Sequence, residues 1–203
     1  PINIPVVLHV VWNTASENVP TATINALITE LNEDYSGTNS DLGSVRPSFQ
    51  GVVGNPGFQF CLAQVDPGGN ATTGIVRTQT TETWFDPDTE TEDVKAAPVG
   101  ARTATHEIGH YLGLLHTFDE GGSCVNSDGF SDTPTSNSPT FSCTNTNLMK
   151  CGVLTQYENF MDYSNCTVMF TDQQAAYMTN VLMNERSGLL ANAACSGPVG
   201  GLC

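Results

Sequence analysis

The stretch His-Glu-Ile-Gly-His-Tyr-Leu-Gly-Leu-Leu-His, residues 106–116, contains three of the four histidines in the chain. Residues four positions apart share one face of a helix, so His106 and His110 can hold one metal ion between them. Gly113 favours the left-handed conformation that ends a helix, and this turn lets His116 reach the same point. Three neutral imidazoles suit Zn²⁺ and leave a fourth position open for water. The stretch therefore predicts a catalytic zinc site.

A carboxylate next to the first of these histidines completes the pattern. Glu107 is placed to direct its side chain at the water and to act as general base. The alternative is a helix whose histidines only face solvent. Such a helix would match the five fixed positions of this pattern only by chance, which is rare for this composition. His9 lies outside the pattern, in an apolar stretch. We predict that it is a buried histidine of the core rather than a ligand.

The composition excludes one large class of function. The chain has 203 residues, with 6 Lys and Arg against 21 Asp and Glu, and a formal net charge of −15. A protein this acidic repels phosphate backbones, and no basic stripe is present, so we exclude nucleic-acid binding. No apolar run approaches the roughly 20 residues that a membrane-spanning helix needs. The length allows one large domain or two small ones.

The cysteines indicate an extracellular protein. Most of the seven lie after residue 120, in segments rich in Gly, Ser, Asn and Thr, and no CxxC or zinc-ribbon spacing is present. In such loop-rich segments disulfides replace a missing core. Residues 1–5 lack the features of a signal peptide, so we expect a secreted, mature form whose leader has been removed. Asn70-Ala71-Thr72 is a candidate glycosylation site.

Hydrophobic spacing predicts an α/β first half and a loop-rich second half. The apolar run over 4–12 is typical of a central strand buried on both faces. The other expected elements are helices over 21–35 and 101–112, strands over 58–65 and 74–80, an exposed connection over 84–92, and a last helix from Thr171, which opens a capping box. Residues 117–168 show little periodicity, so we expect disulfides or ions to hold them.

The zinc stretch also identifies a family. HExxHxxGxxH is the extended signature of the metzincins, and residues 106–116 resemble it at every fixed position. A metzincin needs a methionine turn downstream, and Asn159-Phe160-Met161-Asp162-Tyr163 fits, although Met161 alone would be an ordinary core residue. Within the metzincins the chain resembles the pappalysin family, in particular its compact secreted microbial branch. The further segments that carry this resemblance are 4–7, 60–63, 73–78, 116–118 and 131–134.

This resemblance implies an overall architecture. It is a single metzincin-type catalytic domain of the α/β (α+β) class over 1–203, with a twisted mixed sheet, a backing helix and an active-site helix. The N-terminal subdomain, 1–116, would carry the zinc helix. The C-terminal subdomain, 117–203, would be loop-rich, stapled by disulfides and closed by a helix, with the substrate cleft between the two. A removed N-terminal pro-segment would have inhibited a latent form, and we expect a monomer.

The resemblance also implies roles for single residues. His106, His110 and His116 would bind zinc, and Glu107 would be the general base. Tyr163 would stabilise the oxyanion through its hydroxyl, the alternative being a buried structural tyrosine.

The resemblance suggests disulfides Cys124–Cys151 and Cys143–Cys166, although four cysteines allow three pairings and the sequence does not choose among them. Two arrangements stay open for the remaining cysteines. Either Cys195 pairs with Cys203 and leaves Cys61 free, or Cys61 pairs with Cys195.

An acidic group follows the zinc helix, and relatives in this family bind calcium in that region. Hard oxygen ligands on loops suit Ca²⁺. Of the acidic residues there, which include Asp119 and Glu120, we take Asp128 and Asp132, with Thr133, as the candidate ligands. The alternative is a solvated acidic loop, since the spacing is not that of an EF-hand.

Specificity is where the sequence departs from the family pattern. Members that select a basic residue after the scissile bond carry an acid immediately before the last staple cysteine, where this chain has Asn165. A neutral amide cannot form that ion pair, so we expect a broader set of side chains at P1′.

These observations predict a secreted zinc endopeptidase acting on proteins or peptides. One alternative is a catalytically silent, metal-stabilised binding or adhesion module on the same fold, which would usually have lost the base or a ligand. A disulfide-rich structural protein with a fortuitous motif is the other. The intact set of Glu107 and three histidines favours the enzyme.

Overall fold

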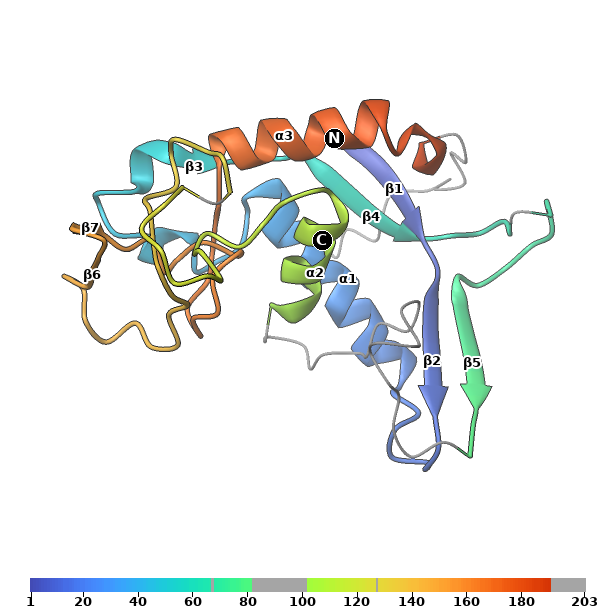
Figure 1. The fold of residues 1–203 in the computed structure, drawn as a ribbon. Coiled ribbons are helices and arrows are strands. Elements are labelled where there is room, and N and C mark those ends of the chain that lie inside the picture. The colour runs from blue at the N-terminus through green and yellow to red at the C-terminus, as the bar shows by residue number, and fades with distance from the viewer. Residues whose placement is uncertain (67, 82–101, 127, 191–203) are drawn as a thin grey trace.

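The segment with the three histidines, residues 106–116, lies in the middle of the molecule (Figure 1). The computed structural model describes residues 1–66, 68–81, 102–126 and 128–190. In Figure 1, helix α2 (Thr103–Tyr111) lies between the parallel strand pairs of the first half and the loops of the second. The elements are β1 (Ile2–Val6), β2 (Leu8–Trp12), α1 (Thr21–Ser36), η1 (Leu42–Ser44), η2 (Gln50–Val52), β3 (Val53–Gly54), β4 (Phe58–Leu62), β5 (Ile75–Gln79), α2 (Thr103–Tyr111), β6 (Met149–Lys150), β7 (Val153–Leu154), β8 (Phe170–Thr171), α3 (Asp172–Asn184) and η3 (Ser187–Leu189).

The apolar run at the start forms two successive strands rather than one. β1 pairs in parallel with β4, and β2 in parallel with β5. Ile4 and Val10 are buried, but Val7 is 41% exposed. The expectation of a strand buried on both faces is therefore wrong. His9 is exposed as well, because it points away from the buried face on which Val10 lies, and the prediction of a core histidine is also wrong.

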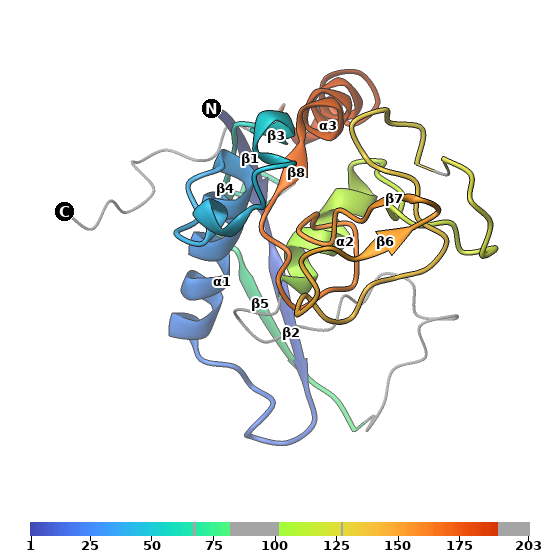
Figure 2. The same ribbon diagram turned by 90° about the vertical axis from the view of Figure 1, so that its left-hand side faces the viewer.

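Helix α1 lies against this layer, as its spacing predicted. Ile24, Ile28, Leu31 and Tyr35 are buried at intervals of three or four residues. Gly37 ends the helix with φ +63°, and the amide of Thr38 donates to the carbonyl of Glu33. Figure 2, turned by 90°, shows α1 running alongside β2 and β5.

The central core joins residues from both halves of the sequence. Tyr35 stacks on Phe58 and lies 5.0 Å, centroid to centroid, from Phe170. The fully buried members of this core include Leu112, Leu114, Phe160, Met161, Met178 and Leu182. Helix α3 begins at the expected capping box, in which the Thr171 side chain accepts from the amide of Gln174 and the Gln174 side chain accepts from the amide of Thr171.

Between α2 and α3 the described chain is irregular apart from short strands, and disulfides hold it. Cys124 is bonded to Cys151 and Cys143 to Cys166, the two pairings that the resemblance suggests. Cys61 is also disulfide-bonded, so the arrangement that leaves it free is wrong. The predictions for Cys195, Cys203 and the connection 84–92 lie outside the described residues.

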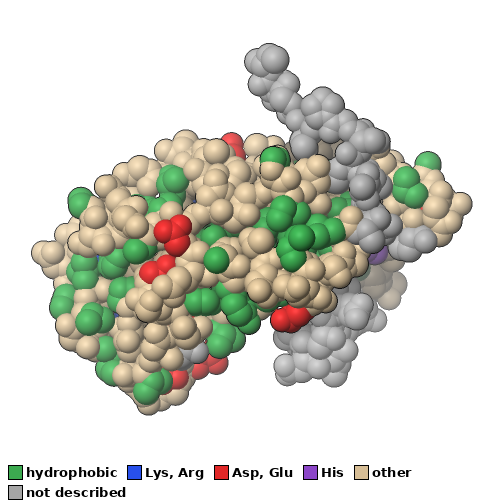
Figure 3. All heavy atoms as spheres, turned by 90° about the horizontal axis from the view of Figure 1, so that it is seen from above, with side chains coloured by type: hydrophobic (Ala, Val, Ile, Leu, Met, Phe, Trp, Pro, Cys, Tyr) green, Lys and Arg blue, Asp and Glu red, His purple; other side chains and the backbone are tan. Residues whose placement is uncertain are grey.

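The part of the chain that the structure describes contains no helix long and apolar enough to cross a bilayer. On the face drawn in Figure 3, the acidic side chains lie at several separate places rather than in one patch.

A buried carboxyl group links α1 to α2. Asp34 accepts a hydrogen bond of 2.6 Å from the Thr105 hydroxyl and lies 2.9 Å from the Arg102 guanidinium, while Tyr35 donates to the Thr105 carbonyl. Burial raises the pKa of Asp34 to about 7, and the contacts with Thr105 and Arg102 reduce this rise without cancelling it.

We predict that Asp34→Asn changes how stability depends on pH. A carboxyl whose pKa is about 7 when folded and about 4 when unfolded makes the free energy of unfolding fall by up to about 1.4 kcal/mol per pH unit between those values. The amide that replaces this carboxyl cannot ionise. The variant should therefore gain stability relative to the wild type as pH rises from 5 to 7, measured by urea unfolding of the metal-free proteins.

Glu33→Gln is the matched control, because Glu33 is an exposed neighbour on the same helix. Its stability should stay parallel to that of the wild type. If the stability of Asp34→Asn also stayed parallel to that of the wild type between pH 5 and 7, the raised pKa of Asp34 would be contradicted.

Candidate metal centre

Three histidine side chains meet at one point beside α2. The Nε2 atoms of His106, His110 and His116 lie 3.0, 3.1 and 3.2 Å from one another. His106 and His110 lie one helical turn apart, and Gly113, with φ +89°, turns the chain so that His116 approaches from a third direction. Among the described residues this is the one group of at least three His, Cys, Asp or Glu side chains placed to hold a metal ion.

Each imidazole is held in one orientation by its other nitrogen. Nδ1 of His106 lies 2.7 Å from the Phe160 carbonyl, and Nδ1 of His110 lies 2.8 Å from the Leu114 carbonyl. Carbonyls only accept, so both Nδ1 atoms carry the proton and both Nε2 atoms present a lone pair. Nδ1 of His116 lies 2.7 Å from a carboxylate oxygen of Glu120, which sets the same tautomer.

This donor set fits a tetrahedral cation. Three lone pairs that face one another at about 3 Å repel unless a positive charge lies between them. Zn–N distances of about 2.0–2.1 Å place the nitrogens of a tetrahedral site about 3.3 Å apart. Burial also lowers the pKa of His106, which keeps the imidazole neutral and able to bind metal at neutral pH.

The methionine turn, residues 159–163, lies directly against α2. Met161 is fully buried, and its carbonyl accepts from the amide of Thr117, next to the last histidine. A Cβ atom at position 109 would lie only 2.6 Å from the Met161 sulfur. Gly109 therefore lets the helix approach the turn closely.

Two amide side chains hold this turn from inside. Asn159 donates to Gln156 and Gln174 at 2.9 Å each and accepts from the amide of Met161 at 3.0 Å. Gln174 is the capping-box residue of α3 and is fully buried. The start of α3 is thus fixed to the turn, a connection that sequence spacing alone does not predict.

Tyr163 lies beside the histidines and is half exposed. Its ring centroid is 4.8 Å from that of His116 and 5.5 Å from that of His106. Burial raises the pKa of Tyr163, and the charges of Glu120 and Glu107 raise it further, so the hydroxyl keeps its proton at neutral pH. Glu107 lies on the exposed side of α2, and its negative charge is felt at the Tyr163 hydroxyl.

Two cavities flank Tyr163. One of about 330 Å³ is lined by Asn165 with Asp41, Arg102 and residues 163–167, and so lies between the two halves of the chain. The other, of about 440 Å³, is lined by Phe118, Asp119, Glu120, residues 137–139 and Tyr163.

The acidic residues after α2 separate into different roles. Glu120 contacts His116, and its position four residues after that histidine was the signal that could have identified it. Asp132 accepts from the Thr171 hydroxyl and from the amide of Gln173, both at 2.9 Å, at the start of α3. Asp128 accepts from the Thr133 hydroxyl at 2.9 Å, while its other oxygen is buried without a hydrogen-bond partner in the described residues.

Comparison with known proteins agrees with this geometry. The model of a peptidase family described as pregnancy-associated plasma protein-A, the pappalysins, matches residues 71–183, more than half of the chain. The chain belongs to the pappalysin family. This pappalysin also resembles mature mirolysin of Tannerella forsythia, solved in complex with a cleaved peptide, with a TM-score of 0.83 and 28% identity over 96% of each chain.

Curated relatives of this pappalysin are fungal. An extracellular metalloprotease of Arthroderma otae is 41% identical over 90 residues, which cover 43% of this chain and 33% of that protein. Extracellular metalloprotease 1 of Coccidioides posadasii is 39% identical over 90 residues, covering 43% and 32%. This chain thus covers about a third of the length of each of these relatives.

We predict that Glu120→Ala weakens metal binding, because His116 loses the acceptor that orients its ring. Loss of such a partner typically lowers metal affinity about 10–100-fold. Competition with a chelator, using Zn²⁺, measures the change. Glu120→Gln keeps an acceptor oxygen and should lose less, and equal affinity of the wild type and Glu120→Ala would contradict this role.

Proposed function

We propose that this pappalysin is a secreted, zinc-dependent endopeptidase that hydrolyses peptide bonds in proteins. The observation that carries the proposal is the convergence of three Nε2 atoms within 3.2 Å, with every Nδ1 bound to an acceptor. The names of the fungal relatives, which are extracellular metalloproteases, support secretion, as do the disulfides. Mature mirolysin with its cleaved peptide supports proteolysis.

His106, His110 and His116 would hold the zinc ion. Bound zinc supplies a Lewis acid that polarises the scissile carbonyl and lowers the pKa of water. Glu107 removes the proton from the attacking water and returns it to the leaving amine. The Tyr163 hydroxyl, which is protonated at neutral pH, donates a hydrogen bond to the oxyanion of the tetrahedral intermediate.

We predict that Glu107→Gln lowers the rate of casein cleavage at least about 100-fold, because the amide cannot accept the proton from water. One zinc ion per chain should remain bound. Tyr163→Phe should lower kcat less, about 10–100-fold, with little change in KM, because it removes one oxyanion donor. Zinc content by elemental analysis and casein hydrolysis with and without chelator measure both. Near-normal activity of pure Glu107→Gln protein would overturn the assignment of the base.

The substrate cleft would lie between the subdomains 1–116 and 117–203. The cavity beside Asn165 is then the pocket for the residue after the scissile bond, since it adjoins Tyr163 and has walls from both parts. The neutral Asn165 amide admits more side chains than a carboxylate would. Proteomic profiling of cleavage sites should show no dominance of Arg or Lys at P1′, and Asn165→Asp should increase cleavage before these residues.

Calcium would bind in the loop region that follows α2, through Asp128, with Asp132 and Thr133 nearby. The buried, unpartnered oxygen of Asp128 supports this, because a cation would satisfy it. Without a cation, burial raises the pKa of Asp128. Asp132, in contrast, already has two hydrogen bonds at the start of α3.

We predict that protein stripped with EDTA regains its full melting temperature only when calcium is added with zinc, because the ion binds the folded state alone. Asp128→Asn should remove the calcium-dependent part of the increase. Asp119→Asn, in the same acidic region, is the matched control. Complete recovery with zinc alone would rule calcium out.

Two further features follow from the same proposal. A longer promirolysin chain, which this chain matches at 27% identity over 95% of its own length and 84% of the other, supports synthesis with an inhibitory pro-segment that is later removed. The enzyme would act as a monomer.

A further inference from the structure

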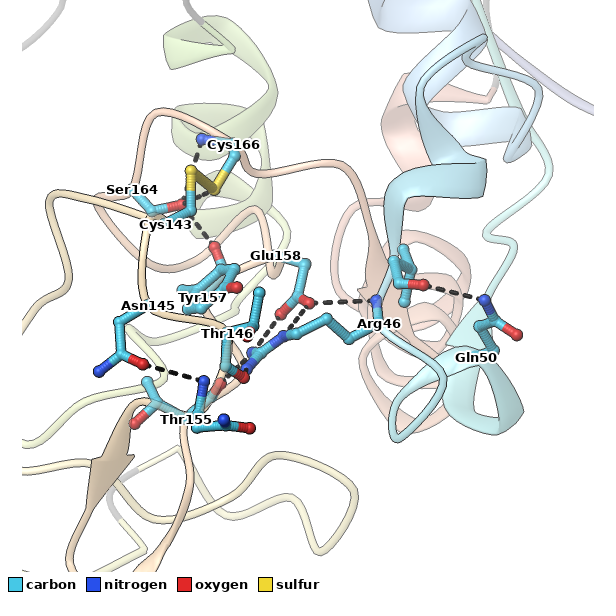
Figure 4. Close-up of polar contacts among 12 residues, drawn as sticks. Arg46, Gln50, Cys143, Asn145, Thr146, Thr155, Tyr157, Glu158, Ser164 and Cys166 are labelled. Carbon is cyan, nitrogen blue, oxygen red and sulfur yellow. Dashed lines mark hydrogen bonds and ion pairs between the residues drawn. A yellow bond between two sulfur atoms is a disulfide. The ribbon is translucent and has the colours of Figure 1, made fainter.

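An arginine distant in sequence from the histidines holds the base of the methionine turn. In Figure 4 the guanidinium of Arg46 faces the carboxylate of Glu158. Nε lies 2.5 Å from Oε1 and Nη2 lies 2.8 Å from Oε2, and the Arg46 amide also donates to Oε1 at 3.2 Å. The two side chains are only 11% and 3% exposed. A buried pair with two parallel bonds tolerates little displacement of either partner.

The same arginine fixes the neighbouring chain segments. Its Nη1 donates to the Thr146 carbonyl at 2.7 Å, and its Nη2 donates to the Thr155 carbonyl. The guanidinium also lies over the ring of Tyr157, 3.8 Å from the centroid. One side chain thus joins two segments of the irregular second half, one at Thr146 and the other over residues 155–158.

Main-chain hydrogen bonds continue from Glu158 to the first histidine. The Glu158 carbonyl accepts from the amides of Val168 and Met169 at 2.7 and 3.1 Å, and the amide of Phe160 donates to the Met169 carbonyl at 2.8 Å. The next carbonyl in this chain of contacts, that of Phe160, is the acceptor for Nδ1 of His106 at 2.7 Å. A shift of Glu158 therefore moves the group that orients a metal ligand.

The other end of the same loop is tied to the same base. The Ser164 hydroxyl donates to the Tyr157 carbonyl at 2.5 Å and closes the loop over residues 157–164. Tyr163, which lies beside His106 and His116, is the residue just before this closure. Both the His106 acceptor and the Tyr163 ring therefore depend on where Tyr157 and Glu158 lie.

We propose that Arg46 is a positioning residue for the metal centre, acting through Glu158 on the Phe160 carbonyl and on Tyr163. The inference rests on the proposed function for its effect on catalysis but not for its effect on the metal. Displacements of about 1 Å at a catalytic group lower rates about 100-fold, and loss of a partner that orients a ligand lowers metal affinity about 10–100-fold.

The test uses a variant that removes both charges, Arg46→Met with Glu158→Gln, so that no unpaired charge is left buried. In the folded variant kcat should fall about 10–100-fold with KM changed less than about threefold. The visible spectrum of the Co²⁺-substituted protein should shift, and zinc should pass to a chelator about 10-fold faster. Arg46→Lys, made in the wild type, keeps the charge but not the fork of donors. Its kcat, cobalt spectrum and zinc release should therefore lie between those of the wild type and the charge-free variant.

Arg77→Met is the matched control. Arg77 also donates to a loop carbonyl, that of Val19 at 2.7 Å, and to the side chains of Asn18 and Thr21. It is exposed and lies at the end of the molecule formed by β2 and β5. It should leave kcat, the cobalt spectrum and zinc release unchanged.

A folded charge-free variant with wild-type kcat, cobalt spectrum and zinc release would overturn the proposal and leave Arg46 a purely structural residue. If that variant does not fold, Arg46→Lys decides: a wild-type spectrum and rate overturn the proposal, and intermediate values support it. A wild-type protein without peptidase activity would refute the proposed function, whereas the spectrum and zinc release would still test Arg46.

Discussion

Three imidazole nitrogens that point at one another are the constraint on which the rest of this structure depends. His106, His110 and His116 each present a lone pair at Nε2 because Nδ1 is already bound to an acceptor. The acceptors at Nδ1 hold each ring in the orientation that a shared metal ion requires. The carbonyls of Phe160 and Leu114 provide two of the three acceptors. Partners of this kind fix the ring orientations and the tautomer with which the three histidines face a metal ion.

Helix α2 carries two of the histidines, and the rest of the scaffold around the centre is largely loop. Hydrogen bonds of polar side chains hold these loops in place. Asn159 and Gln174 hold the methionine turn by hydrogen bonds between buried amides, and each bond adds directionality that apolar packing lacks. Gly109 lets Met161 pack directly against α2. The two disulfides restrain the chain on either side of this turn. Precision at the centre therefore comes from many short-range constraints on irregular backbone.

The few cations in this acidic chain serve as cross-links. Arg102 joins α1 to Asp41 through its contacts with Glu30, Asp34 and Asp41. Lys150 donates to the carbonyls of residues 138 and 139 and to the hydroxyl of residue 140. Guanidinium and ammonium groups offer several donors each, so a single residue can satisfy several loop carbonyls at once. A strongly negative surface is thus compatible with a well-ordered loop region.

Local patterns in the sequence determined the helices, the histidine set and the turn that follows them, because spacing, glycine and capping residues act within a few positions. Tertiary structure alone decided which acceptors hold the imidazoles, how Arg46 reaches Glu158, and that the first apolar run has an exposed face that includes His9. These depend on which distant segments meet, and no local spacing encodes that. Asp132 illustrates the difference: the sequence shows only an acid in a loop, and the fold shows that both of its oxygens accept hydrogen bonds at the start of α3.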